Sequence, residues 1–184
     1  MTEPVRRNRG TLYVLIALFF LPLGVAFFLY YGAGWRPAGQ TNHGELLSPL
    51  RALPADATAL RGKWALVYVG EGRCDEVCRT ALIFSRQTRL SLNQEMLRLD
   101  RFFIATGECC DRAYLDSVQL GLKLIEVPDA AASALVRSFP ETDRAHSLFV
   151  VDPLGNLVMR YDVRQSPKGL LSDLQKLLKL SHIG

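Results

Sequence analysis

The four cysteines of the chain form two close pairs, Cys74 with Cys78 and Cys109 with Cys110. Cys74 and Cys78 follow a strand-like apolar run and stand where a helix is expected to open. If both lie in the first helical turns, their spacing puts the sulfurs on one face, with Cβ atoms about 5–6 Å apart. That is wider than the roughly 3.5–4.5 Å of a relaxed disulfide. The pair therefore predicts either an easily reduced disulfide or two thiolates for a soft ion such as Cu(I) or Zn.

Charges around the first pair act in both directions on its thiols. A helix N-terminus favours the thiolate, and Arg73 and Arg79 add to this effect. Asp75 and Glu76 oppose it. A structural disulfide or two buried thiols is the alternative. We favour a functional site, because a bridge across so short a loop gains little entropic stabilisation.

If the first pair exchanges disulfides, we expect distinct roles for its two sulfurs. Cys74 would be the attacking thiolate, being nearer the loop and more exposed, and Cys78 the resolving one.

His146, just before the apolar run Leu148–Val151, is a candidate third ligand for a metal. A lone histidine is more often a surface or hydrogen-bonded residue, but in the α/β fold that the strand and helix signals predict, this connection lies beside the cysteine loop.

The second pair, Cys109 and Cys110, follows the strand-like run 99–106. Parallel strands present their C-terminal ends at one edge of a sheet, where sites form. We therefore hypothesise that these thiols lie near Cys74 and Cys78, as auxiliary metal ligands or exchange partners. A surface bridge or two half-buried thiols is the competing interpretation. Since neighbouring cysteines bridge each other only through a small strained ring, pairing across to the first loop is expected to be easier.

These thiols lie far beyond one apolar segment near the N-terminus. Residues 11–35 are 25 residues without a charge, and a bilayer core needs roughly 20 apolar residues in a helix. Tyr30, Tyr31 and Trp35 at its far end are typical of an interfacial aromatic belt. A cleaved signal peptide usually has a shorter apolar region and a clean exit site. The segment therefore predicts a retained transmembrane anchor.

Basic residues set the expected orientation. Arg6, Arg7 and Arg9 precede the anchor against the single acid Glu3, so the positive-inside rule leaves residues 1–10 as a cytoplasmic tip. Everything after the anchor is then expected on the periplasmic or equivalent exported side of the inner membrane. Disulfides persist in such a compartment.

Composition bounds what the exported part does. The whole chain carries 22 Lys+Arg and 18 Asp+Glu; without Glu3 and the three arginines of the tip, the net charge is about +2. That balance excludes an electrostatic nucleic-acid binder, which needs a basic face. Glycines and prolines between residues 36 and 60 predict a linker. Residues 61–184 are enough for one domain.

The domain alternates strand and helix signals. Expected strands occupy residues 63–69, 99–106, 148–151 and 157–161, and expected helices occupy residues 75–92, 111–119 and the C-terminal stretch that Ser166 and Pro167 open. Asp152-Pro153-Leu154-Gly155-Asn156 is a strong hairpin signal. A β-α-β opening, a terminal hairpin and a last amphipathic helix describe a thioredoxin-like α/β domain behind one transmembrane helix.

These features together resemble the Sco/SenC family of membrane-anchored copper chaperones. The resemblance rests on the strand, the CxxxC loop, and a histidine-serine step that leads into an apolar strand and Asp-Pro-Leu-Gly-Asn. Asp75 and Arg79 stand where the family commonly has prolines, and no aspartate directly precedes His146. The segment 106–111 also departs from the family pattern. The chain therefore resembles a divergent member.

The resemblance implies a function and a ligand set. Cys74, Cys78 and His146 match the family's copper ligands, so it implies that the domain binds Cu(I) and helps to assemble the copper centre of cytochrome c oxidase. An oxidase subunit, or another copper or thiol protein, is the implied partner. Two alternatives stay open: a thiol–disulfide oxidoreductase that maintains the cysteines of a metalloprotein client, and an assembly scaffold with a degenerate site.

Overall fold

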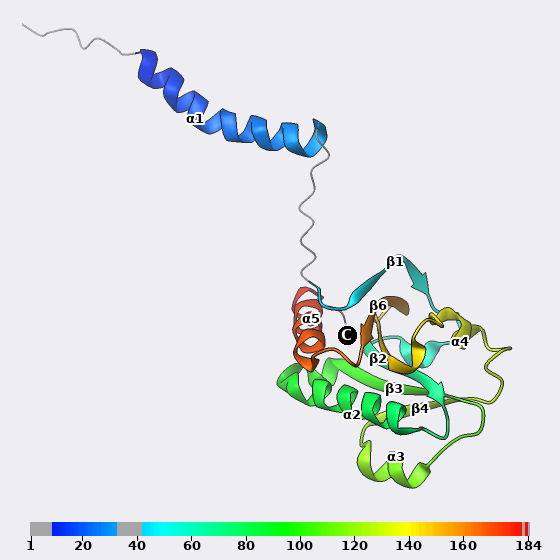
Figure 1. The fold of residues 1–184 in the computed structure, drawn as a ribbon. Helices are drawn as coiled ribbons and strands as arrows, with labels where there is room; N and C mark the ends of the chain where they lie inside the picture. Colours follow the sequence, from blue (N-terminus) through cyan, green and yellow to red (C-terminus); the bar gives the residue numbers. More distant parts are fainter. Residues whose placement is uncertain (1–8, 33–41, 182, 184) are drawn as a thin grey trace, which may run out of the picture. The chain divides into compact units, whose positions relative to one another are not determined.

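The computed structural model describes residues 9–32, 42–181 and 183, and the chain divides into two units at residue 40 (Figure 1). The first unit is the helix α1 (Arg9–Phe27), which continues as a π-helical turn (Phe28–Gly32). By length and composition, Arg9–Gly32 is one candidate membrane span among the described residues. Trp35 and most of the predicted cytoplasmic tip lie outside the described residues. The predicted apolar N-terminal helix is thus present.

The second unit is built on a six-stranded sheet with strand order β1-β6-β5-β2-β3-β4. Its strands are β1 (Glu45–Ala52), β2 (Trp64–Glu71), β3 (Leu99–Thr106), β4 (Leu122–Val127), β5 (Ser147–Val151) and β6 (Asn156–Asp162). β2, β3 and β4 are parallel, whereas β5, β6 and β1 are joined by antiparallel pairings. This mixed sheet agrees with the predicted thioredoxin-like fold.

The β-α-β opening follows directly from the apolar runs. Residues 64–69 of β2 are all buried, as a central strand covered on both faces requires. The helix α2 (Glu76–Ser91) and a 3-10 segment (Asn93–Arg98) then lead to β3, which pairs in parallel with β2. Because the crossover returns β3 beside β2, the loops after both strands emerge at the same edge of the sheet.

The predicted hairpin is also confirmed. β5 and β6 pair in antiparallel register, and the Asp152 carboxylate closes the turn by accepting from the backbone N–H groups of Leu154 and Asn156. This short polar side chain replaces the backbone partners that the turn lacks.

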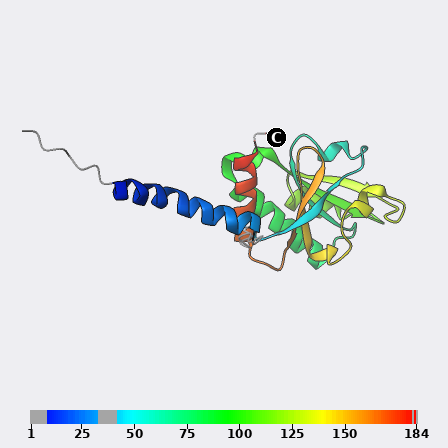
Figure 2. The same ribbon diagram turned by 90° about the horizontal axis from the view of Figure 1, so that it is seen from above.

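Helices cover one face of the sheet more fully than the other. α2, α3 (Arg112–Val118) and α5 (Pro167–Leu180) contribute to one buried cluster; α5, in red, lies beside α2, in green (Figures 1 and 2). The opposite face is covered by residues 53–60 and the short helix α4 (Ala134–Ser138). The cysteine loops therefore lie at the edge of a fully packed core.

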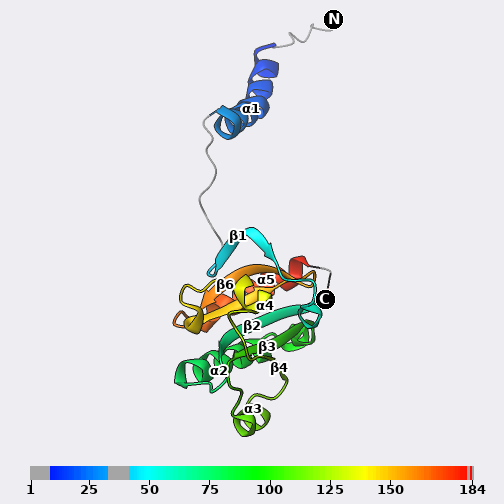
Figure 3. The same ribbon diagram turned by 90° about the vertical axis from the view of Figure 1, so that its right-hand side faces the viewer.

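The prediction of a linker over residues 36–60 is wrong from residue 42 onward. β1 pairs with β6 at the edge of the sheet (Figure 3), and a 3-10 turn (Thr58–Leu60) follows it. Leu53, Ala57 and Leu60 are buried. Pro49 suggested a linker, but an edge strand tolerates proline, and its register shifts between Leu46 and Arg51. Residues 36–41 lie outside the described residues.

A buried carboxylate fixes the start of this edge. Asp173 in α5 is 3% exposed and accepts from the backbone N–H groups of His43 (2.6 Å) and Gly44 (2.9 Å). The His43 imidazole Nδ1 lies 3.1 Å from the same carboxylate. The residues that lead into β1 are therefore bonded to the last helix of the domain.

Candidate dithiol site

Cys74 lies at the corner where β2 turns into α2. Its φ of 48° is left-handed, which is uncommon for a residue other than glycine. Asp75 is the N-cap of α2, and its side chain accepts from the backbone N–H of Cys78 at 2.9 Å. Cys74 is thus outside the helix, so the predicted helical spacing of the two sulfurs is wrong. The left-handed turn folds Cys74 back over the first helical turn.

This turn allows the two cysteines to bond. A disulfide joins Cys74 and Cys78, with Cα atoms 5.1 Å apart, inside the usual range for such bridges. Both residues are 2% exposed. The prediction that Cys74 is the more exposed sulfur is therefore wrong, since the core encloses both equally. As described, this site is a closed and buried disulfide.

A second disulfide joins Cys109 to Cys110. The expectation that these cysteines would pair more easily with the first loop is wrong, because Cys109 is bonded to Cys110 and Cys74 is bonded to Cys78. Both Cys109 and Cys110 are half-buried and pack against the cluster that contains Cys74 and Cys78. The two cysteine loops share one region of the molecule, at the edge where parallel strands end.

Backbone contacts hold the two loops together. The Gly72 N–H donates to the Thr106 carbonyl (2.9 Å), and the Thr106 hydroxyl donates to the Gly70 carbonyl (3.1 Å). A Cβ at Gly72 would lie 2.2 Å from the Glu108 carbonyl oxygen and 2.7 Å from the Cys109 Cα. Only glycine permits so close an approach. The first loop therefore contacts the backbone that leads into the second disulfide.

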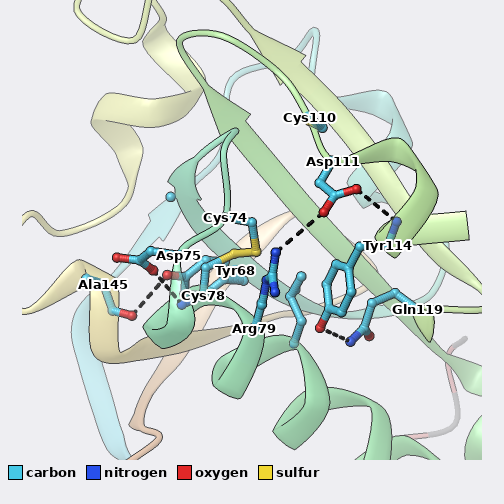
Figure 4. Close-up of a disulfide and its surroundings, with 12 residues drawn as sticks. Tyr68, Cys74, Asp75, Cys78, Arg79, Cys110, Asp111, Tyr114, Gln119 and Ala145 are labelled. Atoms are coloured by element: carbon cyan, nitrogen blue, oxygen red, sulfur yellow. Dashed lines mark hydrogen bonds and ion pairs between the residues drawn. A yellow bond between two sulfur atoms is a disulfide. The ribbon is translucent and has the colours of Figure 1, made fainter. Parts of the chain in front are cut away.

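Arg79 connects α2 to the second loop. Its guanidinium pairs with Asp111 at 3.4 Å and lies 4.9 Å from the centre of the Tyr114 ring. Figure 4 shows Arg79 of α2 directed toward Asp111, with Tyr114 beside it. The Asp111 carboxylate also caps α3, accepting from the Tyr114 N–H at 3.1 Å. Arg79 was expected to favour a thiolate; in the structure its nearest partners are groups of the Cys109–Cys110 loop and α3.

A buried hydrogen-bond network continues from Tyr114. Gln119 donates to the Tyr114 hydroxyl (3.0 Å) and accepts from Arg101 (2.6 Å). Arg101 is 1% exposed and also donates to Ser85 and to the Leu82 carbonyl. Burial, with nearby Arg89 and Arg86, lowers the pKa of Arg101 to about 10. Sequence reasoning missed this network, although an arginine inside a strand buried on both faces was a readable signal.

Tyr68 links the site to the histidine segment. Its hydroxyl donates to the Ala145 carbonyl at 3.1 Å. Burial, with the Asp75 carboxylate adding a smaller effect, raises the pKa of Tyr68 to about 12. The phenol therefore stays neutral and remains a donor at physiological pH. Its bond ties the 3-10 turn Arg144–His146 to the central strand.

His146 lies beside α2, but it does not join the sulfurs. Its Nδ1 is 3.2 Å from the Asp143 carboxylate, and its side chain is 35% exposed. It lines a cavity of about 320 Å³ with Glu76, Val77 and Thr80 of α2. Within residues 9–32, 42–181 and 183, no three His, Cys, Asp or Glu side chains are grouped to hold a metal ion. With the disulfide closed, Cys74 and Cys78 offer no thiolate.

Solved structures similar to this chain share its fold. ScoI of Bradyrhizobium japonicum with copper bound is 18% identical with a TM-score of 0.50, and covers 72% of this chain and 98% of its own. Yeast Sco1 is 17% identical with a TM-score of 0.57; the match covers 78% of this chain and 98% of the yeast chain. A putative protein disulfide isomerase from Bacteroides thetaiotaomicron is 18% identical with a TM-score of 0.52; the match covers 74% of this chain and 89% of the Bacteroides chain. These likenesses confirm the fold that the Sco/SenC resemblance implied.

No curated protein matches the chain. A family model does match, over residues 64–181, which include β2, both cysteine pairs, His146 and the whole of α5. That range is more than half of the chain. The protein therefore belongs to the family described as transmembrane-like, thioredoxin-like, C-terminal domain.

Proposed function

We propose that this domain is a thiol–disulfide exchange module that acts on the cysteines of a metalloprotein client, with the copper-binding cysteines of an oxidase subunit as the client class. The observation that carries the proposal is the closed Cys74–Cys78 disulfide at the β2–α2 corner of a thioredoxin-like domain. Disulfide exchange needs only these two sulfurs, whereas a metal would need a third ligand drawn toward them.

In the reducing direction, the pair is first reduced and the β2–α2 corner opens to expose Cys74, whose thiolate then attacks one sulfur of the client disulfide. The client S–S bond breaks, and its second sulfur leaves as a thiolate and takes a proton. Cys78, as a thiolate, then attacks the Cys74 sulfur, which re-forms the Cys74–Cys78 disulfide and releases the first client sulfur as a thiol. Two electrons pass from the domain to the client, and a protein dithiol in the same compartment restores the reduced pair.

The apolar N-terminal helix indicates on which side of the membrane the proposed reaction occurs. α1 supports a single-pass attachment with the N-terminus in the cytoplasm, following the arginines that precede the apolar segment. The domain then faces the periplasmic or equivalent side of the inner membrane. Clients assembled at that membrane surface meet the dithiol there.

Cu(I) binding by Cys74, Cys78 and His146 is the second candidate function, with copper as cargo for the copper centre of cytochrome c oxidase. The observation that favours it is the position of His146, which shares a cavity with Val77 and Thr80 of the helix that carries Cys78. Binding requires that the disulfide be reduced and that the imidazole leave Asp143. Thiolate and imidazole ligands suit Cu(I).

One set of variants separates the two functions. The full-length protein in detergent is reduced and assayed for reduction of a synthetic peptide that carries an intramolecular disulfide, and for Cu(I) retention against a competing chelator under anaerobic conditions. We expect Cys74→Ser with Cys78→Ser to abolish peptide reduction and His146→Ala to leave it mostly intact. His43→Ala is the matched control. It also removes one imidazole, but that imidazole contacts Asp173 of α5 and is not a proposed copper ligand.

Three outcomes are informative. Unchanged peptide reduction in the double cysteine variant would overturn the exchange function. Stoichiometric copper retention that is lost in His146→Ala, but not in His43→Ala, would establish the copper function in its place. If the double cysteine variant matched the wild type in both peptide reduction and copper retention, the domain would be a scaffold with a degenerate site.

A further inference from the structure

We propose that Cys109–Cys110 is the outer redox couple of a two-step relay, which exchanges electrons with a protein dithiol partner and passes them to the buried Cys74–Cys78 couple. The inference rests on the proposed function only in taking Cys74–Cys78 as redox-active. It adds a second couple, an order of reaction and a surface for the partner.

Access is the first argument. An attacking thiolate must reach a disulfide sulfur directly, and Cys74 and Cys78 are each 2% exposed. Cys109 and Cys110 are half-buried, and their loop begins with the exposed residues Gly107 and Glu108. While the Cys74–Cys78 disulfide is closed, the second disulfide is therefore the one that a large partner can approach.

Contact between the loops is the second argument. The Gly72 Cα lies so close to the second loop that a Cβ would overlap the Glu108 carbonyl oxygen. The Gly72–Thr106 hydrogen bond and the Arg79–Asp111 ion pair cross between the same two segments. Figure 4 shows Arg79 directed from α2 toward Asp111, the residue next to Cys110. These contacts hold the two couples within one small region, as direct sulfur exchange requires.

The surface beside the loops offers a docking place. A cavity of about 330 Å³ is lined by residues of both loops, including Gly72, Arg73, Gly107 and Glu108. A partner chain seated in it would lie next to Cys109. Arg73 and Glu108 give this surface charges of both signs, which suits a polar segment of a partner.

The relay is balanced as two exchanges. The partner dithiol reduces Cys109–Cys110 and becomes a disulfide. One thiolate of the outer pair then attacks the Cys74 sulfur, so the Cys74–Cys78 bond breaks and Cys78 leaves as a thiolate. The second thiolate of the outer pair attacks the sulfur now joined to Cys74, which re-forms Cys109–Cys110 and releases Cys74. Two electrons and two protons have moved from the outer pair to the inner pair.

The first test follows reduction of the full-length protein in detergent, with reduced thioredoxin as the probe, by alkylation and mass spectrometry of each pair. We expect Cys109–Cys110 to be reduced before Cys74–Cys78. In Cys109→Ser with Cys110→Ser, reduction of the inner pair should slow by about tenfold or more, since the probe must reach buried sulfurs. Equal rates for the inner pair in both proteins would overturn the relay.

The second test traps the intermediate. Each of four double variants keeps one cysteine per loop, for example Cys78→Ser with Cys110→Ser. At least one of them should form an intramolecular disulfide between the loops under mild oxidation. Free, alkylated thiols in all four folded variants would show that the couples do not exchange. Because neither test uses a client, peptide reduction in the wild type without any inter-loop disulfide would reject the relay alone.

Gly72→Ala tests the contact without removing a sulfur. Its Cβ would push against backbone atoms of Glu108 and Cys109, so we expect the loops to separate and the transfer to slow severalfold. Gly107→Ala is the matched control: it lies in the second loop at a φ of 70°, and its Cβ meets nothing within 4 Å. Gly72 does not share the positive φ of Gly107, so a slowing in Gly72→Ala no greater than that in Gly107→Ala would contradict the role of the loop contact.

Discussion

The guanidinium of Arg101 donates a 2.6 Å hydrogen bond to the side-chain oxygen of Gln119 inside the domain core. Gln119 in turn donates a hydrogen bond to the Tyr114 hydroxyl. The Tyr114 ring packs against the Arg79 guanidinium beside the second cysteine loop. A buried arginine of β3 is thus linked through Gln119 and Tyr114 to the helix that follows the second cysteine loop.

Replacement of Arg101 by methionine should destabilise the domain. The change leaves Gln119 and the Leu82 carbonyl without their buried donor, which costs about 1–3 kcal/mol of unfolding free energy. Urea unfolding of the full-length protein in detergent measures this. Lys123→Met, which removes a partly exposed ion pair with Asp100, should cost less than about 1 kcal/mol; equal losses would contradict a special role for the buried network.

Asp75 has two separable effects. Asp75→Ala removes the N-cap acceptor of the Cys78 N–H and should cost about 1 kcal/mol of unfolding free energy. Asp75→Asn keeps an acceptor and should retain most of that stability. Both changes remove a negative charge beside the dithiol, so both should speed alkylation of the reduced protein by iodoacetamide at neutral pH. A faster reaction in only the alanine variant would assign the effect to fraying of the helix.

Tyr68 should ionise later than an exposed tyrosine. Its folded-state pKa of about 12 lies above the ordinary value of 10.0. The stability that the neutral phenol contributes is therefore complete below about pH 10 and is lost as the pH rises through about 12. An ultraviolet titration of phenolate absorbance should show this late component. Because burial also raises the pKa of Tyr161, the Tyr68→Phe variant should lose part of the late absorbance change, and an unchanged titration curve in that variant would contradict the assignment.

Asp173 should hold the start of the domain. Asp173→Ala leaves the His43 and Gly44 N–H groups without their acceptor, at a cost of about 2 kcal/mol or more. We expect amide hydrogen exchange to accelerate in residues 43–52, because β1 then loses its attachment to α5. The exposed Asp116→Ala serves as the control. Unchanged protection of β1 would show that its pairing with β6 suffices.

Much of the fold could be predicted because its signals are local. Continuous apolar runs identified the buried strands β2, β3 and β5, and Asp152 with Gly155 identified the hairpin turn. β1, β4 and the short α4 were missed. β1 is exposed over most of its length and carries Pro49, so its pairing depends on β6, a partner that no local pattern reveals.

The site was only partly predictable for the same reason. Spacing selected Cys74 and Cys78, but their separation depends on the left-handed backbone at Cys74 and on the Asp75 cap. Two neighbouring strand ends correctly predicted that the cysteine loops lie together. The placement of His146 depends on long-range contacts, namely the Tyr68–Ala145 bond and its packing on α2.

The β1 pairing has a consequence for proteolysis between residues 53 and 60. A protease that cut between residues 53 and 60 would release a body without its outermost strand, and the ladder groups of β6 that now pair with β1 would face solvent. Such unpaired edges recruit strands from other molecules. Loss of β1 after such a cut would therefore yield a self-associating species, whereas a cut ahead of His43 would leave the edge of the sheet paired.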